Sequence, residues 1–475
     1  MSLINVGSEA NDGTGDPLRT AFQKLNANVP RFYFESVGIS IEQDSALTYA
    51  SGQMHSVSEG DILWTQDGFR FSVLASAAEE WDRLTESGVK LQAEADTNGA
   101  HSILQFGADT SQPNNAPFIQ KALDRSYVYH LTGPVGEFEI TEPLWIKRDS
   151  TTFTGPTSVG GAIGAGNRSL RIKKTTSTEI DFKGTMVNAA IVMGRTGSGY
   201  IAHVTLENLH ILADHSTVEY GLYVPVSALH RYSSIGITGF RIGYFTNDSW
   251  LHNWQSVRVD CRTISADAAT AGIGTQQGWT ETTIGIRWDG AGSGAGPGNS
   301  FTSVWVRNAH IGWSIQGMGY GALNACGADQ MSVTAYDLNS SILTLNGCGM
   351  ENSYCGGDLI QVIGSQCHIT INNFKSDGRC QGNLNSESLT AKVRAGTSAK
   401  LIMNGVRLSD FENPRNSYNI LIRGGSHVIT NNSRMPTNGN ADPLYQSGGT
   451  WVDTTNGVTE WRNANGTNTQ GPPAS

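Results

Sequence analysis

The chain has 475 residues, of which 56 are glycine and only 16% are charged, and its formal net charge is -10 at pH 7. This composition favours many short strands and turns over long helices, so we expect an all-β protein. The negative charge and the lack of any long lysine or arginine run argue against nucleic-acid binding. No run of about 18 apolar residues occurs, which argues against membrane insertion.

Residues 1–30 predict a short N-terminal helix. Asp16 suits the N-cap and Pro17 the first helical position, and the apolar side chains of Leu18, Phe22 and Leu25 would form one stripe. A helix this short is marginal alone, so the stripe needs a partner. That partner is either the rest of the same chain or another subunit.

The segment from Asn11 to Asn28 closely resembles the N-terminal motif of bacteriophage tail-fibre and tailspike proteins, where it joins the fibre to the tail. The resemblance implies that residues 1–30 attach the protein to phage tail or baseplate proteins, through Asp16, Pro17, Leu18, Phe22 and Leu25. The first residues lack the basic and apolar regions of an export signal. We therefore expect a virion protein of the phage tail that is synthesised in the host cytoplasm.

Residues 31–100 predict a small β-rich neck domain. Polar and apolar residues alternate between Asp61 and Leu74, and Asp67-Gly68 is a hairpin-turn signal between two β-rich runs.

The next segment predicts the start of a solenoid. The turn Phe106-Gly107-Ala108-Asp109 is followed by a short amphipathic helix from Pro117 to Asp124 and then by short β-rich runs. This order resembles the opening of pectate-lyase-like right-handed parallel β-helices, in which the helix caps the open end. A cap is needed because an uncapped first coil would expose its apolar cross-section and unpaired strand edges.

A four-residue phrase then recurs at intervals of about one coil. Its copies are Leu323-Asn324-Ala325-Cys326, Leu345-Asn346-Gly347-Cys348, Ile371-Asn372-Asn373-Phe374 and Met403-Asn404-Gly405-Val406. We expect the asparagine of each copy to mark a corner with left-handed backbone. The four asparagines should then stack as a hydrogen-bonded ladder along the solenoid.

The same register predicts a column of acids. If Cys326, Cys348 and Phe374 point inward, strand alternation turns Asp329, Glu351 and Asp377 outward in adjacent coils. The spacing of neighbouring strands, about 4.8 Å, suits the carboxyl pairs of glycosidases, and close acids raise one another's pKa. These residues are candidates for acid/base catalysis; hydrogen bonding to a glycan, or no site at all, are the alternatives. The fourth copy has Ser409 at this position.

A second candidate surface combines tryptophans with polar residues. Alternation would place Asp248, Trp250, His252, Trp254 and Asp260 on one face, and such a cluster suits glycan binding. The alternative is that the two tryptophans belong to the core.

The remaining features predict no metal or cofactor site. The six cysteines include no CxxC pair, and we expect them to be reduced core residues. The Gly/Ala/Thr-rich interval of about 262–300 predicts a surface insertion and not a central strand; it is either a disordered excursion or a loop that contacts a ligand. Residues 436–475 predict a C-terminal β segment or trimerisation tail, with Trp451 and Trp461 as its large apolar anchors.

Taken together, these features predict an all-β chain with a right-handed parallel β-helix over residues 101–435. The resemblance implies a bacteriophage tail fibre or tailspike that assembles as a homotrimer and binds a host surface polysaccharide. One alternative is a tailspike depolymerase that cleaves capsule or lipopolysaccharide as a hydrolase or a lyase. Others are a structural fibre adaptor and a secreted polysaccharide lyase.

Overall fold

The structure is a computed structural model that describes residues 48, 56–65, 68–156, 169–195, 197, 199–213, 218–261, 283–290, 296–331, 333–351, 358–376, 390–408, 417–433, 444–454, 460–462 and 468–470. The chain divides into two compact units, Met1–Ala108 with Arg125–Thr132, and Asp109–Asp124 with Gly133–Ser475. Several predicted site residues lie outside the described residues, and their roles stay predictions: Asp16, Pro17, Leu18, Phe22, Leu25 and Asp377.

The first unit contains a small antiparallel sheet. Its strands follow the order β1-β2-β4-β3, and β1 and β2 pair across the predicted turn, where Gly68 has a φ of 83°. The elements of this unit are β1 (Ile62–Trp64), β2 (Arg70–Val73), β3 (Arg83–Leu84), β4 (Lys90–Glu94), β5 (His101–Ser102), η2 (Ile103–Phe106) and β6 (His130–Thr132).

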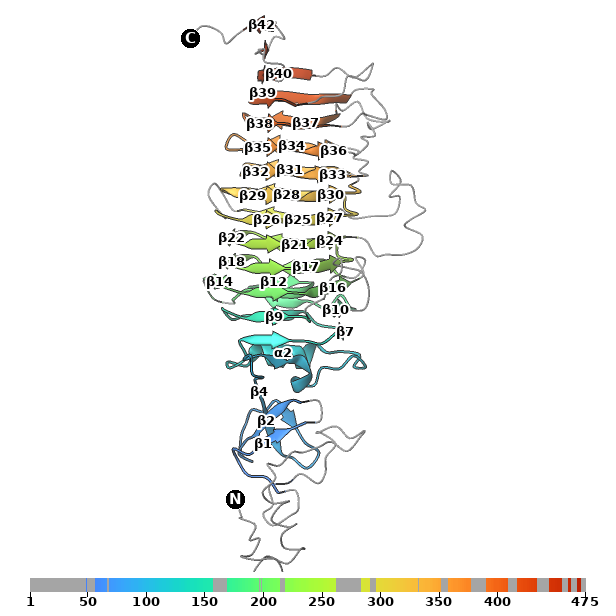
Figure 1. Cartoon of the computed structure of the whole chain (residues 1–475), viewed down its shortest axis with the longest axis vertical. Coiled ribbons are helices and arrows are strands. Elements are labelled where there is room, and N and C mark those ends of the chain that lie inside the picture. The colour runs from blue at the N-terminus through green and yellow to red at the C-terminus, as the bar shows by residue number, and fades with distance from the viewer. Residues whose placement is uncertain are drawn as a thin grey trace, which may run out of the picture. The chain divides into compact units, whose positions relative to one another are not determined.

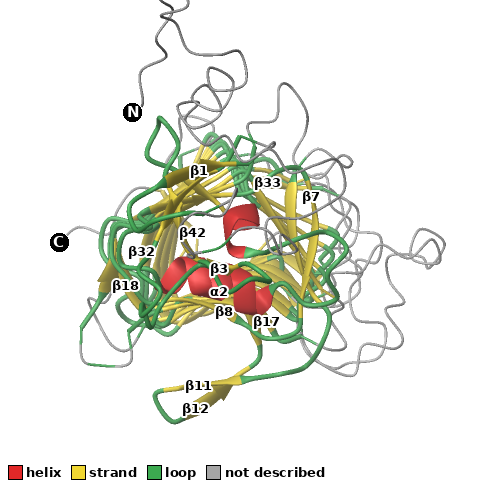
Figure 2. Cartoon of the chain, turned by 90° about the horizontal axis from the view of Figure 1, so that it is seen from below, coloured by secondary structure: helices red, strands yellow, loops and turns green. Residues whose placement is uncertain are grey.

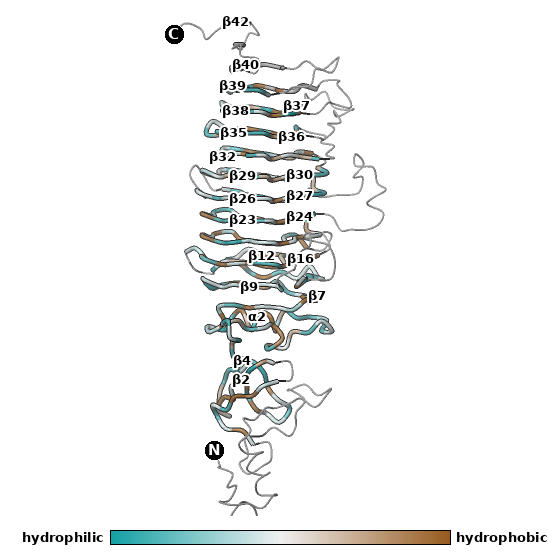
Figure 3. The backbone as a smooth tube through the Cα atoms, viewed as in Figure 1, coloured by the Kyte–Doolittle hydropathy of each residue, from teal (hydrophilic) through white to brown (hydrophobic). Residues whose placement is uncertain are grey.

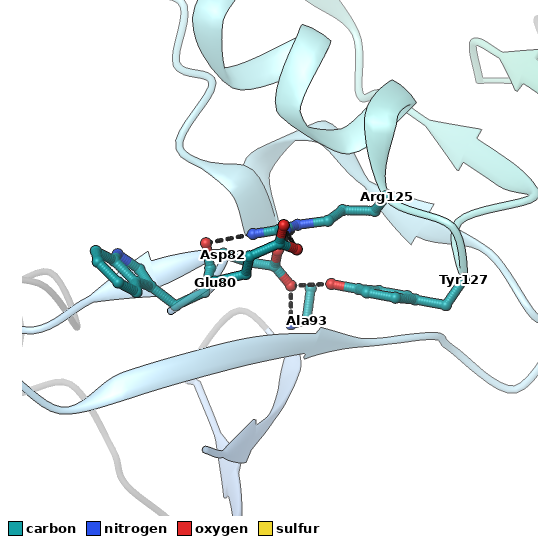
Figure 4. A network of polar contacts seen from close by, with 6 residues as sticks. Glu80, Asp82, Ala93, Arg125 and Tyr127 are labelled. Carbon is teal, nitrogen blue, oxygen red and sulfur yellow. Dashed lines mark hydrogen bonds and ion pairs between the residues drawn. The ribbon is translucent and has the colours of Figure 1, made fainter. Parts of the chain in front are cut away.

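A polar network around the buried carboxylate of Asp82 connects two chain segments of this unit (Figure 4). Asp82 accepts hydrogen bonds from the backbone N–H of Ala93 (2.7 Å), from Nε of Arg125 (2.7 Å) and from the hydroxyl of Tyr127. Arg125 also bonds Glu80 (2.5 Å). A buried charge is tolerated when it is paired and hydrogen-bonded, so this network fixes residues 125–132 to the small sheet.

The second unit is a parallel β-helix whose coils stack one above another (Figure 1). Each coil contributes strands to three parallel ladders, and the predicted all-β fold with a parallel β-helix is confirmed.

The first ladder is the nine-stranded sheet of β7 (Gly136–Ile140), β10 (Leu170–Lys174), β16 (Leu209–Ala213), β20 (Gly236–Thr238), β24 (Arg258–Asp260), β27 (Trp305–Arg307), β30 (Gly327–Asp329), β33 (Gly349–Met350) and β36 (Lys375–Ser376). The second ladder contains β8 (Leu144–Ile146), β13 (Ala189–Met193), β17 (Tyr220–Tyr223), β21 (Ile242–Thr246), β25 (Ile284–Asp289), β28 (Ile311–Gln316), β31 (Thr334–Asn339), β34 (Ile360–Ile363) and β37 (Thr390–Gly396).

The third ladder contains β9 (Thr152–Thr154), β15 (Thr205–Glu207), β19 (Arg231–Ser233), β23 (Asn253–Gln255), β26 (Ser300–Thr302), β29 (Gly321–Asn324), β32 (Ile342–Asn346), β35 (His368–Asn372) and β38 (Lys400–Asn404). The long strand β39 (Ser417–Asn431) pairs with both β37 and β38, and β40 (Leu444–Asp453) continues the stack. Two short strands, β41 (Glu460–Arg462) and β42 (Asn468–Gln470), pair antiparallel after it.

Helix α2 (Ala116–Asp124) lies across the end of the stacked coils, as the sequence predicts (Figure 2). Its buried side chains are those of Ala116, Ile119, Ala122 and Leu123. The side-chain amide of Gln120 accepts a hydrogen bond from the backbone N–H of Trp145 in β8 (2.7 Å) and donates one to its carbonyl oxygen (3.0 Å). The helix therefore covers the apolar cross-section that the first coils would otherwise expose to water.

Hydrophilic and hydrophobic residues are interspersed along the coils (Figure 3), and the apolar side chains that point inward form the core. The largest fully buried side chains include Trp254, Trp288, Trp313, Tyr232 and Tyr244. The rings stack between coils, with centroids 4.1 Å apart for Tyr232 and Trp254. Apolar burial of this kind dominates the stability of the β-helix.

Two short peripheral elements leave the coils. The hairpin of β11 (Ile180–Phe182) and β12 (Thr185–Val187) projects outward (Figure 2), and Phe182 packs edge-on against Trp145 and Tyr223. The strands β14 (Ile201–Ala202), β18 (Val226–Ala228) and β22 (Asp248–Trp250) form a separate three-stranded parallel sheet.

The predicted asparagine ladder is present and is longer than expected. Side-chain amides bond from Asn346 to Asn324 (2.9 Å), from Asn372 to Asn346 (2.8 Å), from Asn404 to Asn372 (2.8 Å) and from Asn431 to Asn404 (2.7 Å). The prediction that the asparagine itself has left-handed backbone is wrong. The next residue has it, at Ala325 (φ 50°), Gly347 (58°), Asn373 (54°) and Gly405 (62°), because the asparagine completes the strand and the chain turns after it.

The prediction that residues 262–300 are a surface insertion without a central strand is partly wrong. Ile284–Asp289 forms β25, a strand paired with β21 and β28 inside the second ladder. The glycines and alanines around this segment hide its alternation, although Ile286 and Trp288 are fully buried.

The cysteines that the structure describes are core residues, as predicted. Cys261, Cys326, Cys348 and Cys367 are buried free thiols. Cys326 and Cys348 lie above one another after the asparagine corner, which supports the inward register used to predict the acid column.

Candidate functional site

The outer face of the nine-stranded sheet presents two parallel columns of side chains. In β24, β27 and β30 the central residues Val259, Val306 and Ala328 are buried, so the residues on either side of each point outward. Register places Arg258, Trp305, Gly327, Gly349 and Lys375 in one column, and Asp260, Arg307 and Asp329 in the other. Neighbours within a column are about 4.8 Å apart at the backbone.

The predicted acid column is present for the two members that the structure describes. Asp329 is half-buried at the end of β30, and Glu351 is exposed directly after β33. Oδ1 of Asp329 accepts a hydrogen bond of 3.0 Å from the backbone N–H of Glu351. The two acids are therefore neighbours on one surface, as the register predicts, whereas Asp377 lies outside the described residues.

The carboxyl of Asp329 has an unusual proton affinity for an aspartate. Burial raises its pKa to about 6, and the charge of Glu351 acts in the same direction. The hydrogen bond from Glu351 and the positive charges of Arg307 and Arg258 act in the opposite direction. A carboxyl with such a pKa exchanges its proton near neutral pH, which is a property of acid/base groups.

Trp305 lies beside these acids and was not among the predicted site residues. Its side chain is 36% exposed, and the benzene ring of its indole covers Gly327 on the next strand. A Cβ atom at Gly327 would come within 2.2 Å of that ring, so only glycine leaves room for it. Gly349 follows in the same column, which leaves the sheet without side chains at two successive positions.

Two arginines flank the tryptophan. Arg258 precedes Trp305 in its column, and Arg307 is on the same strand two residues on. Arg258 lies 3.7 Å from the buried carboxylate of Asp260, which also accepts a 2.8 Å hydrogen bond from Asn308.

We call Arg258, Trp305, Arg307, Gly327, Asp329, Gly349 and Glu351 the Trp305 face. The column that contains Asp329 could have been extended to Arg307 and Asp260 by continuing the register two coils back. Thr302 pairs with Asn324 and Gln255 with Thr302, and residues five positions later are Arg307 and Asp260. The signal was lost because threonine and glutamine replace the repeated asparagine there.

The second predicted surface does not form as one face. Asp248 and Trp250 point outward from β22, but His252 and Trp254 are buried, with exposures of 1% and 0%. Leu251 between them has left-handed backbone (φ 56°), which breaks the alternation on which the prediction rested. Asp260 belongs to the nine-stranded sheet, in the same column as Arg307. The expectation of a shared face is therefore wrong for His252, Trp254 and Asp260.

The two remaining residues form a small cluster, which we call the Trp250 corner (Tyr200, Asp248 and Trp250). The indole N–H of Trp250 donates to Asp248 (2.7 Å), and the hydroxyl of Tyr200 donates to the same carboxylate (3.2 Å). The rings of Tyr200 and Trp250 are 4.8 Å apart. The polar groups of this corner are thus bonded to one another.

Metal clusters and membrane-spanning helices are both absent from the part of the chain that the structure describes. No cluster of three or more His, Cys, Asp or Glu side chains among the described residues could hold a metal ion. In that part of the chain no helix is long and apolar enough to span a membrane.

Comparison with known proteins identifies the fold. The tailspike gp42 of Acinetobacter phage vb_AbaP_AS12 superposes with a TM-score of 0.64 at 18% identity, over 88% of this chain and 76% of that one. The enzymatically active domain of bacteriophage CBA120 tailspike protein 2 gives 0.46 at 13% identity, over 82% and 52% of the two chains. DFA-IIIase from Arthrobacter chlorophenolicus A6 gives 0.44 at 11% identity, over 71% and 88%.

Sequence comparison adds nothing to this result. No protein-family model matches the chain. No curated protein matches it either. The chain has the parallel β-helix fold of a phage tailspike, and at 18% identity the likeness concerns the fold alone.

Proposed function

We propose that this chain, which has the fold of a phage tailspike, is a tailspike that binds a host surface polysaccharide at the Trp305 face. The observation that carries the proposal is the exposed indole of Trp305, which covers Gly327 beside the carboxylates of Asp329 and Glu351. Sugar rings stack their C–H faces on aromatic rings, and their hydroxyl groups donate to carboxylates. One surface here offers both kinds of contact.

The direct test is binding of the purified full chain to an array of bacterial surface polysaccharides. The proposal predicts saturable binding to at least one polymer. A properly folded protein that binds none of the polymers, and none of the corresponding bacteria, would favour a structural fibre adaptor instead.

Attachment to the virion belongs to the same proposal. Residues 1–30 would join phage tail or baseplate proteins through Asp16, Pro17, Leu18, Phe22 and Leu25, which places the protein in the phage tail after its synthesis in the host cytoplasm. A chain that lacks residues 1–30 should keep its polysaccharide binding but fail to join purified tails. Loss of both properties would contradict the assignment of separate roles.

Assembly as a homotrimer is also proposed. An outward column on the third ladder supports it, because this column carries no charge over Ser300, Ala322, Thr344, Thr370, Ile402 and Ile429. Ile402 and Ile429 are each 36% exposed, and a second copy of the chain would cover them. Light scattering should give three times the chain mass; a monomer would contradict the proposal.

A second candidate function is cleavage of the bound polysaccharide by hydrolysis. The observation that favours it is the pKa of Asp329, raised to about 6 by burial, next to the exposed Glu351. Asp329 would act as general acid and Glu351 as the nucleophile or the base that activates water.

The sign of the pH dependence follows from that pKa. A general acid must be protonated, and Asp329 is mostly protonated below about pH 6, so the turnover rate should fall as the pH rises above 6. Sizing of the polysaccharide after incubation measures the rate, and Asp329→Asn and Glu351→Gln should each abolish shortening while binding persists. Undiminished shortening by either variant would exclude this pair as the catalytic acids.

A further inference from the structure

We infer that the polysaccharide bound at the Trp305 face is anionic, and that Arg258 and Arg307 recognise its acidic groups. The inference rests on the proposed function and names the class of glycan. Three features of the two arginines support it: their contacts, their position beside Trp305 and the distribution of charge around them.

The guanidinium groups of Arg258 and Arg307 have weak contacts within the part of the chain that the structure describes. Arg307 donates one long hydrogen bond, of 3.5 Å, to Gln330, and its Nε is buried with no partner there. Arg258 has one long ion pair, of 3.7 Å, with Asp260. A guanidinium has five N–H donors, so most donors of both groups have no acceptor among the residues that the structure describes.

Other arginines of the chain are bonded more closely. Arg125 forms bonds of 2.5 to 2.7 Å with Glu80, Asp82 and the backbone of Trp81. Arg171, on the outer face of the same nine-stranded sheet, pairs with Glu137 at 3.0 Å. Arg171 differs from Arg307 in having a charged partner at 3.0 Å, although the Nε atoms of both are buried without a partner among the described residues.

The position of the two arginines suits a ligand that lies on Trp305. Arg258 lies opposite Trp305 on the adjacent strand β24. Arg307 lies two residues after Trp305 on β27. Both charges also act on the carboxyl of Asp329, so they reach the part of the surface where the acids lie. A sugar ring stacked on the indole would place its ring substituents next to these cations.

The positive charges of this surface are placed to contact an anionic ligand. Arg258 and Lys375 belong to the column of Trp305, which carries no acid between them, whereas Asp260, Asp329 and Glu351 lie in the other column with Arg307. Neutral sugars do not require cations, because carboxylates and amides satisfy their hydroxyl groups. A guanidinium fork matches the paired oxygens of a carboxylate or a phosphate, and a lysine does so only as a point charge.

The test uses the full chain and an array of purified bacterial surface polysaccharides of three kinds: neutral, carboxylate-bearing and phosphate-bearing. We expect the tightest binding to an acidic polymer, with at least tenfold lower affinity after its acidic groups are removed. Reduction of carboxyl groups to alcohols removes one kind of acid and dephosphorylation the other, so the two treatments show which anion is bound.

Arg307→Gln should lower the affinity for the native polymer at least tenfold and leave the affinity for the treated polymer unchanged. Arg307→Lys keeps the charge without the fork and should give an intermediate loss. Arg171→Gln is the matched control on the same sheet and should bind like the unchanged chain. The melting temperature of each variant shows whether it is folded.

Two outcomes separate this inference from its premise. Tightest binding to a neutral polymer, or equal affinity of the unchanged chain and folded Arg307→Gln for an acidic polymer, would overturn the inference and leave the proposed function standing. Failure to bind any polymer would overturn the proposed function, and the inference with it.

Discussion

The Trp305 face and the Trp250 corner look alike by exposure but differ in their bonding. Each has a tryptophan that is 36% exposed and lies close to a carboxylate. At the corner, Asp248 accepts hydrogen bonds from Trp250 and Tyr200, so its groups satisfy one another. At the face, Arg258 and Arg307 keep contacts of 3.7 and 3.5 Å, and the indole covers a glycine. The proposed site is therefore the tryptophan whose neighbouring arginines have only long contacts among the described residues, and not every tryptophan of equal exposure.

The largest effect is expected for Trp305→Ala. Removal of the ring takes away the surface on which a sugar would stack, and loss of a central aromatic contact costs about 2 kcal/mol, or roughly 30-fold in affinity. Titration of polysaccharide into the purified variant measures the change. An affinity within twofold of the unchanged chain, at an unchanged melting temperature, would remove the basis for preferring this face to the corner.

A smaller loss is expected for Gly327→Ala. The new methyl group would meet the indole at 2.2 Å and lift it from the sheet, although the ring itself is kept. We expect an affinity loss of roughly tenfold or less, since the ring can partly adjust. The matched control is Gly396→Ala, because Gly396 has no atom within 4 Å of an added Cβ. Equal affinities of the two variants would mean that the placement of the indole does not matter.

A loss of stability without loss of binding is expected for Asn372→Ala. The change removes two amide hydrogen bonds of the ladder, to Asn346 and from Asn404, and should lower the free energy of unfolding by about 1 kcal/mol. His368→Ala, at an exposed position on the same strand, is the control. Thermal unfolding and polysaccharide titration together test the separation. A reduced affinity at full stability would show that the ladder takes part in binding.

The smallest effect is expected for Trp250→Ala, the counterpart of the first variant. Because Trp250 and Tyr200 both donate to Asp248, the polar groups of this corner already have partners. Loss of the tryptophan should therefore change the affinity for the polysaccharide less than twofold. A loss as large as that of Trp305→Ala would show that exposure alone identifies the site and would reverse the comparison.

The two faces also show how far the sequence could predict this molecule. Strand alternation placed Asp329 and Glu351 outward correctly, because the repeated asparagine fixed the register of those coils. The same rule failed between Trp250 and His252, where Leu251 has left-handed backbone and reverses the side-chain direction. Leucine gives no sequence signal for that conformation, unlike glycine or asparagine.

Part of the site depends on contacts between coils that are remote in sequence. Trp305 and Gly327 are neighbours only because β27 and β30 pair, and Arg258 is a neighbour of Trp305 across a long stretch of chain that contains β25 and β26. The sequence predicted that stretch to be an insertion without a strand.

The most direct test of the central claim is a crystal structure of the full chain with an oligosaccharide from a polymer that it binds. The account predicts a sugar ring on the indole of Trp305, with acidic substituents bonded to Arg258 or Arg307. A sugar bound at the Trp250 corner or elsewhere, with the Trp305 face empty, would contradict it.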